Sequence, residues 1–279
     1  MAAAAASPLI SPAELAELLD GRGATVLDVR WSLATGSDRD SYLAGHVPTA
    51  QFVDLDHDLA DVPGSGGRHP LPPRDGFVAA MQRCGVHDCD PVVAYDAHSG
   101  LSAARAWWLL RYFGHDDVRV LDGGYPAWLA AGGKSETEIQ APRAGAFCAE
   151  PGGMPVLSAD DAAALAGSGV LLDVRAPERF RGDQEPIDPV AGHIPGAVNL
   201  PATDYVAADG RLLPAQRLRE RFGDLANRPT GAYCGSGVTA AHTVLALEAA
   251  GIAAALYPGS WSGWITDPTR PVATGPASR

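Results

Sequence analysis

Residues 233–242, YCGSGVTAAH, place a cysteine between an apolar run and a turn that contains two glycines. We expect Ala232 and Tyr233 to end a strand, CGSGVT to form a turn, and a helix to begin at Ala240. A Gly-Ser-Gly turn lets backbone N–H groups point inward, as an anion-binding nest beside a helix N-terminus. Such amides favour the thiolate of Cys234 over the thiol, so Cys234 is a candidate nucleophile.

The alternative is that Cys234 is a small buried residue, because free cysteines are often simply part of a core. The first half of the chain argues against this reading. Its comparable stretch, YDAHSGLSAAR, has Asp96 in the register of Cys234, with one more residue before the glycine. A core position would not accept a carboxylate, so we expect this position to face a cavity or solvent in both halves.

The two stretches belong to a longer internal repeat. TVLDVR, AGHVPTA, YDAHSG and GGYPAW in the first half recur in order as VLLDVR, AGHIPGA, YCGSG and GSWSGW in the second. The offset between matched segments drifts slowly, which is typical of loop insertions in a duplicated unit. Each unit begins with a helix cap, at Ser11 and at Ser158, and continues with alternating strand and helix signals. The pattern predicts an α/β fold with two parallel sheets, each flanked by helices.

The domain limits follow from composition. Residues 132–155 are rich in Gly, Pro, Ser and Ala and lack periodicity, as a connecting segment does. We place the first domain at residues 1–140, a linker at 141–155 and the second domain at 156–279. A chain of 279 residues is also long enough for two domains of ordinary size.

The composition is that of a globular protein, with 46% hydrophobic and 19% charged residues. Apolar runs are too short for a membrane span, and the start MAAAAASPLI lacks the charged and long apolar regions of a secretory signal. We therefore expect a cytoplasmic protein that has no membrane partner.

The net charge of −12, without a run rich in Lys and Arg, argues against a nucleic acid as partner. An anionic substrate must then be attracted by a few local arginines or backbone amides. The four cysteines are irregularly spaced, with no CxxC pair and no metal-type Cys/His spacing. We expect no metal site and a reducing compartment.

Taken together, the LDVR strand, GHIPGAVN, YCGSGVT and GSWSGW, duplicated over nearly the whole chain, resemble the tandem-rhodanese sulfurtransferases. The CGSGVT loop resembles the 3-mercaptopyruvate sulfurtransferase type, whereas thiosulfate-preferring relatives tend to place basic residues after the cysteine. The resemblance implies two tandem rhodanese-like domains and a two-step reaction without a cofactor. Cys234 would take the outer sulfur of a small anionic donor as a persulfide, and a thiol, thioredoxin or cyanide would then accept it.

The resemblance also implies the groups that bind the sulfur and the donor. Backbone N–H groups would cradle the persulfide anion, from Gly235, Ser236, Gly237, Val238 and Thr239. In RAPERFRGDQEP, Arg179 matches the arginine that grips the donor's charged group with its guanidinium. Without the family pattern, Arg179 reads equally well as a solvated loop arginine.

A polar relay of the mercaptopyruvate subfamily matches Ser236, His69 in GRHPLP and Asp56 in VDLDHD. Such a relay would polarise the donor thiol and take its proton. The spacing from Asp56 to His69 is two residues longer than in the family pattern. Outside that pattern, His69 reads as an exposed loop residue beside a proline.

The chain also departs from the family after Glu185 and Pro186. Mercaptopyruvate enzymes have a second arginine there, which helps to hold the carboxyl end of the donor, and this chain has Ile187 and Asp188 instead. Arg181 or Arg175 would have to reach in from a different place.

The first half lacks a nucleophile, because Asp96 cannot form a persulfide. We interpret this half as an inactive copy that supplies one wall of a cleft between the halves. His46 and His193 occupy equivalent GH turns in both halves, which favours a structural role for them. Arg105 is expected to anchor packing, and Trp107 and Trp108 to fill the core or the interface.

Other functions stay open beside transfer from 3-mercaptopyruvate. Thiosulfate is the alternative donor, and a non-catalytic module that carries sulfur from another enzyme is a further alternative. Cysteine phosphatases share the architecture, but their loop carries an arginine six residues after the cysteine, where this chain has Ala240. Without that arginine a phosphate dianion lacks its main partner, which disfavours a phosphatase.

Overall fold

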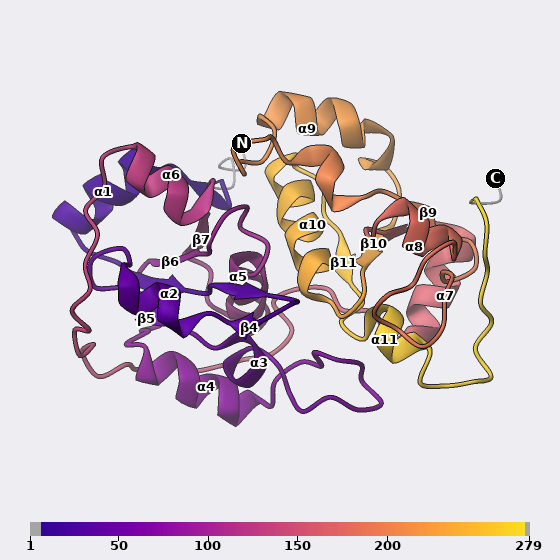
Figure 1. Ribbon diagram of the computed structural model, residues 1–279, viewed down its shortest axis with the longest axis horizontal. Helices are drawn as coiled ribbons and strands as arrows, with labels where there is room; N and C mark the ends of the chain where they lie inside the picture. The colour runs from indigo at the N-terminus through magenta and orange to yellow at the C-terminus, as the bar shows by residue number, and fades with distance from the viewer. Residues whose placement is uncertain (1–6, 277–279) are drawn as a thin grey trace.

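Two parallel sheets form the framework of the computed structural model, which describes residues 7–276 and in which each half of the chain forms one lobe (Figure 1). The strand order is β1-β7-β6-β2-β5 in the first sheet and β11-β10-β8-β9 in the second. An isolated bridge between Val156 and Leu256 adds to the second sheet the position that β1 has in the first. The two sheets therefore have equivalent topologies, as the repeat predicts.

The first lobe contains six helices and seven strands among the described residues. In chain order they are β1 (Leu9–Ile10), α1 (Pro12–Asp20), β2 (Thr25–Asp28), β3 (Trp31–Ser32), β4 (Gly36–Ser37), α2 (Arg39–Ala44), β5 (Gln51–Phe52), α3 (Leu55–Asp58), α4 (Arg74–Arg83), β6 (Val92–Tyr95), α5 (Ala103–Tyr112), β7 (Val118–Leu121) and α6 (Gly124–Ala130).

The second lobe repeats this order with fewer small elements. It consists of α7 (Ala159–Ser168), β8 (Val170–Asp173), α8 (Pro177–Arg181), β9 (Val198–Asn199), the 3-10 turn η1 (Ala202–Tyr205), α9 (Ala215–Phe222), the 3-10 turn η2 (Gly223–Leu225), β10 (Thr230–Tyr233), α10 (Val238–Ala249), β11 (Ala255–Leu256) and α11 (Ser260–Trp264).

Local sequence signals explain where the first helix of each lobe begins. Ser11 caps α1 and Ser158 caps α7, and in both cases the third helical residue, Glu14 or Asp161, bonds back to the cap to complete a capping box. The central strands are short runs of Val and Leu, such as VLLD in β8, whose residues are buried on both faces of the sheet.

The first sheet has one core on each face. Val26, Val93 and Tyr95 pack with residues of α1 and α6 in one cluster. Leu27 and Ala94, which alternate with them, belong to a larger cluster that includes α4 and α5. The same larger cluster continues into α10 and the near face of the second sheet, while α7, α8 and α11 pack on the far face. The lobes therefore share one continuous core.

Helices α5 and α10 form the centre of this shared core, and they lie side by side between the two sheets (Figure 1). Trp107 and Trp108 of α5 are fully buried, as expected for core and interface fillers. An ion pair of 2.9 Å between Arg111 Nη1 and Glu248 Oε1 links the two helices. The carboxyl ends of β6 and β10, which precede these helices, therefore face a common space.

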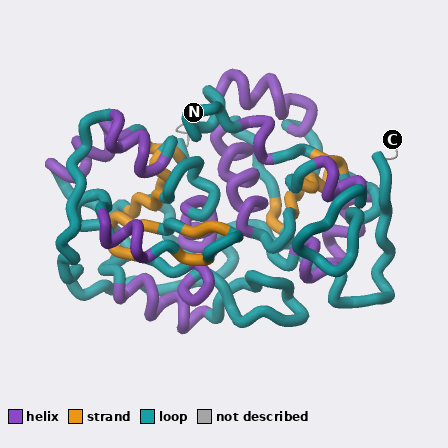
Figure 2. The backbone as a smooth tube through the Cα atoms, in the orientation of Figure 1, coloured by secondary structure: helices purple, strands orange, loops and turns teal. Residues whose placement is uncertain are grey.

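The segment after α6 runs as a long loop around the first lobe before it enters the second (Figure 2). Part of the expected linker, residues 141–155, packs against the first lobe. Phe147 is buried, its ring meets that of Phe77 edge-on at 5.9 Å, and its carbonyl accepts a hydrogen bond from Gln82. This segment is thus fixed to α4 rather than free.

Candidate active site

Cys234 follows β10 directly, at the carboxyl end of the second sheet, where ligands of open α/β sheets bind. Its side chain lines a cavity of about 450 Å³, to which both lobes contribute. The backbone N–H of Gly237 donates to Sγ of Cys234 at 3.1 Å. Cys234 is 3% exposed, so its sulfur is reachable through this cavity and not from the open surface.

The turn after Cys234 is tighter than the sequence suggests, because α10 begins at Val238 and not at Ala240. Gly237 has φ 84°, a left-handed conformation that turns the chain directly into the helix. A Cβ at this position would lie 2.5 Å from the carbonyl oxygen of Pro258. Glycine is therefore required here both by conformation and by space.

Helix α11, from the repeated GSWSGW segment, holds the turn from the side. The N–H groups of Trp261 and Ser262 donate to the carbonyls of Cys234 and Gly235, both at 2.9 Å. Oγ of Ser260 accepts a hydrogen bond of 3.1 Å from the backbone N–H of Cys234. The closing motif of the repeat thus fixes the backbone of the nucleophile.

A loop of the first lobe reaches across to the same helix. Gly67 has φ 99°, and a Cβ on it would lie 2.7 Å from the carbonyl oxygen of Gly259. The next N–H, of Arg68, donates to Oγ of Ser262 at 3.0 Å. This close approach of two backbones brings Arg68 and His69 of the first lobe to the cysteine of the second.

Three of the residues predicted to form a relay lie within hydrogen-bond distance of one another. Nδ1 of His69 is 2.8 Å from Oγ of Ser236, and its Nε2 is 3.1 Å from Oδ1 of Asp56. Since an ionised carboxylate only accepts, Nε2 carries the ring proton, and Nδ1 accepts the hydroxyl proton of Ser236. Nε1 of Trp31 donates to both oxygens of Asp56 at 3.1 Å and so orients it.

The surroundings of His69 keep its ring neutral. Burial, followed by the positive charge of Arg105, lowers the pKa of His69 and outweighs Asp56, which raises it. Arg105 is fully buried and donates to the carbonyls of Leu59, His69 and Pro70. Although burial lowers the pKa of Arg105 to about 10, the group is charged at neutral pH and holds the His69 loop.

Arg179 extends from α8 into the cavity and is bound by two carboxylates. Its Nη2 is 2.8 Å from Glu185 and 2.9 Å from Asp188. Burial by itself would raise the pKa of Glu185, but hydrogen bonds from Arg179 and from backbone N–H groups lower it. The cation expected to bind the donor is thus already paired with anions of its own chain.

The two other arginines considered from the sequence have different surroundings. Arg175 is bound to Asp173 and to the carbonyl of Gly192. Arg30 makes the same contacts in the first lobe, with Asp28 and the carbonyl of Gly45, which indicates a structural role for both. Arg181 pairs with Asp183 near the surface, where its side chain is 41% exposed.

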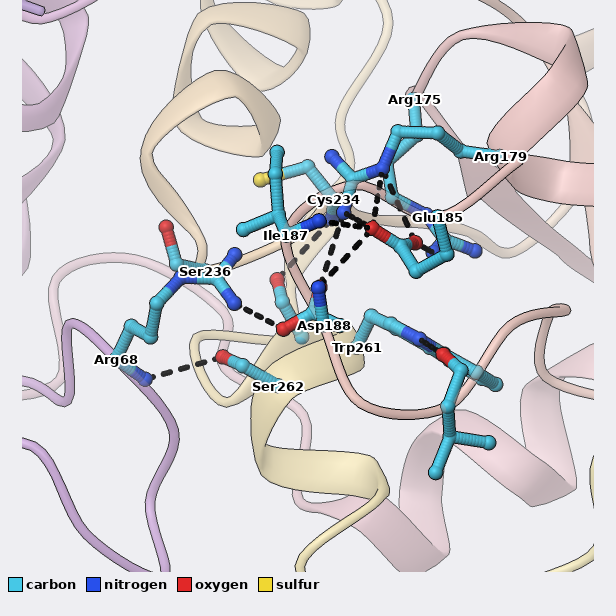
Figure 3. Close-up of polar contacts among 12 residues, drawn as sticks. Arg68, Arg175, Arg179, Glu185, Ile187, Asp188, Cys234, Ser236, Trp261 and Ser262 are labelled. Atoms are coloured by element: carbon cyan, nitrogen blue, oxygen red, sulfur yellow. Dashed lines mark hydrogen bonds and ion pairs between the residues drawn. The ribbon is translucent and has the colours of Figure 1, made fainter. Parts of the chain in front are cut away.

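Arg68 is the cation that the sequence reasoning missed. Its guanidinium forms an ion pair with Asp188, so that Asp188 lies between Arg68 and Arg179 (Figure 3). A Cβ on Gly235 would lie 2.7 Å from Nη2 of Arg68, which places this group beside the nucleophile. The position of Arg68 directly before His69 was the signal that could have revealed it.

His46 and His193 have equivalent contacts in the two lobes. Nδ1 of each ring bonds to a backbone carbonyl, of Tyr42 at 2.9 Å and of Phe180 at 2.7 Å, and both residues are buried. These contacts agree with the structural role that their symmetry suggested.

Two kinds of function receive no support from the part of the chain that the structure describes. Residues 7–276 hold no group of three or more His, Cys, Asp or Glu side chains arranged to bind a metal ion. None of the helices within these residues has both the length and the apolar character needed to cross a bilayer.

A cysteine in an amide-lined turn, with a Ser-His-Asp relay supplied partly by a second copy of the same α/β unit, defines an enzyme with a thiol nucleophile. The family model of the rhodanese-like domain matches residues 11–131 and again residues 158–267. The chain belongs to the rhodanese family and is a sulfurtransferase with two tandem domains of this kind.

The relatives carry two different donor names. SseB of Mycobacterium tuberculosis, provisionally named a thiosulfate sulfurtransferase, is 46% identical over 96% of this chain and 98% of its own length. A provisionally named 3-mercaptopyruvate sulfurtransferase of Pseudomonas aeruginosa is 45% identical over 96% and 98%. The crystal structure of SseA, a 3-mercaptopyruvate sulfurtransferase of Escherichia coli, matches with a TM-score of 0.81 at 30% identity, over 92% of this chain and 99% of that one.

Proposed function

We propose that the protein transfers sulfur from 3-mercaptopyruvate, through a persulfide on Cys234, to a thiol, thioredoxin or cyanide. The observation that carries this choice of donor is the hydrogen-bonded chain from Ser236 through His69 to Asp56. The sulfur of 3-mercaptopyruvate carries a proton that must move during transfer, whereas the outer sulfur of thiosulfate carries none. A neutral histidine linked to a hydroxyl beside the nucleophile suits the first donor.

In the first step the thiolate of Cys234 attacks the donor sulfur, and an S–S bond forms as the donor's C–S bond breaks. The electron pair of that bond stays on the methylene carbon, as the enolate of pyruvate. The donor's thiol proton passes through Ser236 and His69 and ends on this carbon. A Cys234 thiolate and 3-mercaptopyruvate thus become a Cys234 persulfide anion and pyruvate, with charge and protons balanced.

In the proposed intermediate the negative outer sulfur is held by the backbone N–H groups of the turn, those of Gly235, Ser236, Gly237, Val238 and Thr239. Arg179 binds the donor's carboxylate at the other end of the molecule. In the second step an acceptor thiolate or cyanide attacks the outer sulfur and restores the Cys234 thiolate. No metal or organic cofactor takes part in either step.

Thiosulfate is the second candidate donor, and one observation favours it. Arg68 places a positive charge over Gly235, the position after the cysteine where thiosulfate-preferring relatives tend to have basic residues. The name of the Mycobacterium tuberculosis relative points the same way. The reaction with thiosulfate would release sulfite and would not use the relay.

The deciding experiment compares kcat/KM for the two donors side by side, with pyruvate or sulfite release as the readout. We expect the higher value for 3-mercaptopyruvate, and a higher value for thiosulfate would contradict the assignment. Cys234→Ser should abolish turnover of both donors. Stoichiometric labelling of Cys234 without turnover would instead support a sulfur-carrier module.

The proposal includes a cytoplasmic location and the division of the chain into residues 1–140, 141–155 and 156–279. All four cysteines lie within the described residues, and there each is a free thiol, as is usual in a reducing compartment. The bridge at Val156, which begins the second repeat of the sheet, supports the second domain limit.

A further inference from the structure

Two arginines from different lobes flank the residue next to the nucleophile. Arg68 comes from the loop that precedes His69, and Arg179 comes from α8. A Cβ on Gly235 would lie 2.7 Å from Nη2 of Arg68 and 3.7 Å from Nη1 of Arg179. Both side chains line the cavity that contains Cys234. A small donor whose sulfur meets Cys234 therefore has both guanidinium groups within its reach.

The carboxylate of Asp188 occupies the space between these two guanidinium groups (Figure 3). Oδ2 of Asp188 is 2.9 Å from Nη2 of Arg179, and Oδ1 pairs with Nη1 of Arg68. The side chain of Asp188 is 2% exposed, whereas the residue before it, Ile187, is on the surface. Asp188 thus reaches into the cavity from a surface loop, as a carboxylate ligand from outside would.

The charges of this cluster balance without a donor. Arg68 and Arg179 face Asp188 and Glu185, so the cluster has no net charge to attract an anion. A further carboxylate could join only with a penalty for like charges, unless it replaces one of the carboxylates already present. Nε of Arg68 is buried and has no hydrogen-bond partner within residues 7–276, so this guanidinium has an unused donor.

We propose that Arg68 and Arg179 form a two-arginine subsite for the donor's carboxylate, which Asp188 occupies when the donor is absent and leaves when the donor binds. This inference rests on the proposed function. Arg68 takes in space the role of the second arginine that the chain lacks after Glu185 and Pro186. The chemistry is that of a small oxyanion between two planar cations, which the sulfonate-like end of thiosulfate shares with a carboxylate.

The test separates charge recognition from structure by using two donors that differ only in the carboxylate. 3-Mercaptopyruvate has it, and 1-mercaptopropan-2-one, an uncharged α-mercapto ketone, lacks it. Arg68→Gln should lower kcat/KM for 3-mercaptopyruvate about tenfold or more, mainly by raising KM, as loss of a charge-assisted hydrogen bond does. The value for the uncharged donor should stay within about twofold of the wild type.

Arg22→Gln is the matched control, because Arg22 also pairs with an aspartate of its lobe, Asp117, but is exposed and lies outside the cavity. It should change neither donor. An equal loss for both donors in Arg68→Gln would overturn the inference, since it would mean that Arg68 only holds the His69 loop. A loss confined to thiosulfate would also overturn it, as the subsite would then serve the other donor.

Asp188→Asn tests the exchange without removing an arginine. A neutral amide competes less well for the two guanidinium groups, so KM for 3-mercaptopyruvate should fall several-fold while the uncharged donor is unaffected. A rise in KM for both donors would show that Asp188 is a fixed support. Failure of the wild type to turn over 3-mercaptopyruvate would instead contradict the proposed function, and that result is obtained before any variant is compared.

Discussion

The loops after β6 and β10 have the same place in the two lobes but different occupants. In the first lobe the carboxylate of Asp96 accepts hydrogen bonds from the N–H groups of His98, Gly100 and Ser102 at 2.9–3.0 Å. In the second lobe the sulfur of Cys234 accepts one from Gly237 at 3.1 Å. Gly100 and Gly237 both have a left-handed backbone, with φ of 78° and 84°.

The difference shows what the loop is shaped to hold. The oxygens of Asp96 lie two bonds beyond Cβ, and the outer sulfur of a persulfide on Cys234 would lie two bonds beyond its Cβ. The first lobe therefore holds a fixed negative charge at the position where the second lobe would hold one temporarily. The amides around Asp96 support the view that the Cys234 loop stabilises a charged sulfur once transfer has occurred.

The strongest way to break the comparison is to make the second loop like the first. Cys234→Asp should abolish persulfide formation and turnover with either donor, because a carboxylate cannot carry a transferable sulfur. The variant should keep its fold, since its oxygens can use the amides of the turn as Asp96 does. Mass spectrometry after donor treatment and thermal unfolding test the two parts. Residual turnover would place the nucleophile elsewhere.

The next effect concerns the base that the first lobe lends to the second. His69→Asn should lower kcat for 3-mercaptopyruvate about 100-fold, within the range of general acid–base catalysis, and should leave thiosulfate turnover nearly unchanged. Parallel assays with the two donors measure this ratio. A similar loss with both donors would mean that His69 supports the loop rather than moving a proton.

The first loop can also be emptied of its charge. Asp96→Asn replaces one carboxylate oxygen by an NH₂ group that faces N–H donors, so at least one hydrogen bond to a charged acceptor is lost. We expect the free energy of unfolding to fall by about 3 kcal/mol, while the Cys234 persulfide still forms. Urea denaturation gives the first quantity and mass spectrometry the second. Unchanged stability would show that the carboxylate is not held as a fixed charge.

The helices after the two loops differ at one buried position, and pH exposes that difference. Arg105 of α5 corresponds in register to His242 of α10. Burial lowers the pKa of His242 to about 4, so this ring is neutral in the folded protein while the unfolded chain, with an ordinary pKa near 6.5, takes up a proton. Stability is thus fully present above about pH 6.5 and is lost as the pH falls toward 4.

Between pH 7 and pH 5 this linkage costs about 2 kcal/mol of the free energy of unfolding. His242→Gln should remove that part of the acid loss, which urea denaturation of both proteins at the two pH values measures. An equal acid loss in both would assign it to other groups, such as His69 or His115, whose pKa values burial also lowers.

The sequence predicted the repeated α/β fold and the family correctly, because both rest on local patterns that occur twice in the same order. It also named Ser236, His69 and Asp56, which lie together in the structure although 167 residues separate His69 from Ser236. That grouping came from a family pattern and not from periodicity, and the catalytic roles of these residues stay predictions.

Arg68 and Asp188 could not be found in the same way, because their contact joins residues 120 positions apart on loops without periodicity. The missing arginine after Pro186 was visible in the sequence. Its replacement from the other lobe depends on how the two sheets pack, which no local pattern encodes. The early start of α10 was missed for a similar reason, since it depends on the left-handed conformation of Gly237.

The close approach of Gly67 to Gly259 has a consequence for how the two copies can evolve. A duplicated unit that has lost its nucleophile is ordinarily free to decay, but here the unit without the cysteine carries the base and a cation of the site. A single added methyl group at Gly67 would meet the Gly259 carbonyl at 2.7 Å and push the two loops apart. In a genetic screen, such a substitution in the silent copy should be as damaging as loss of the cysteine in the active one.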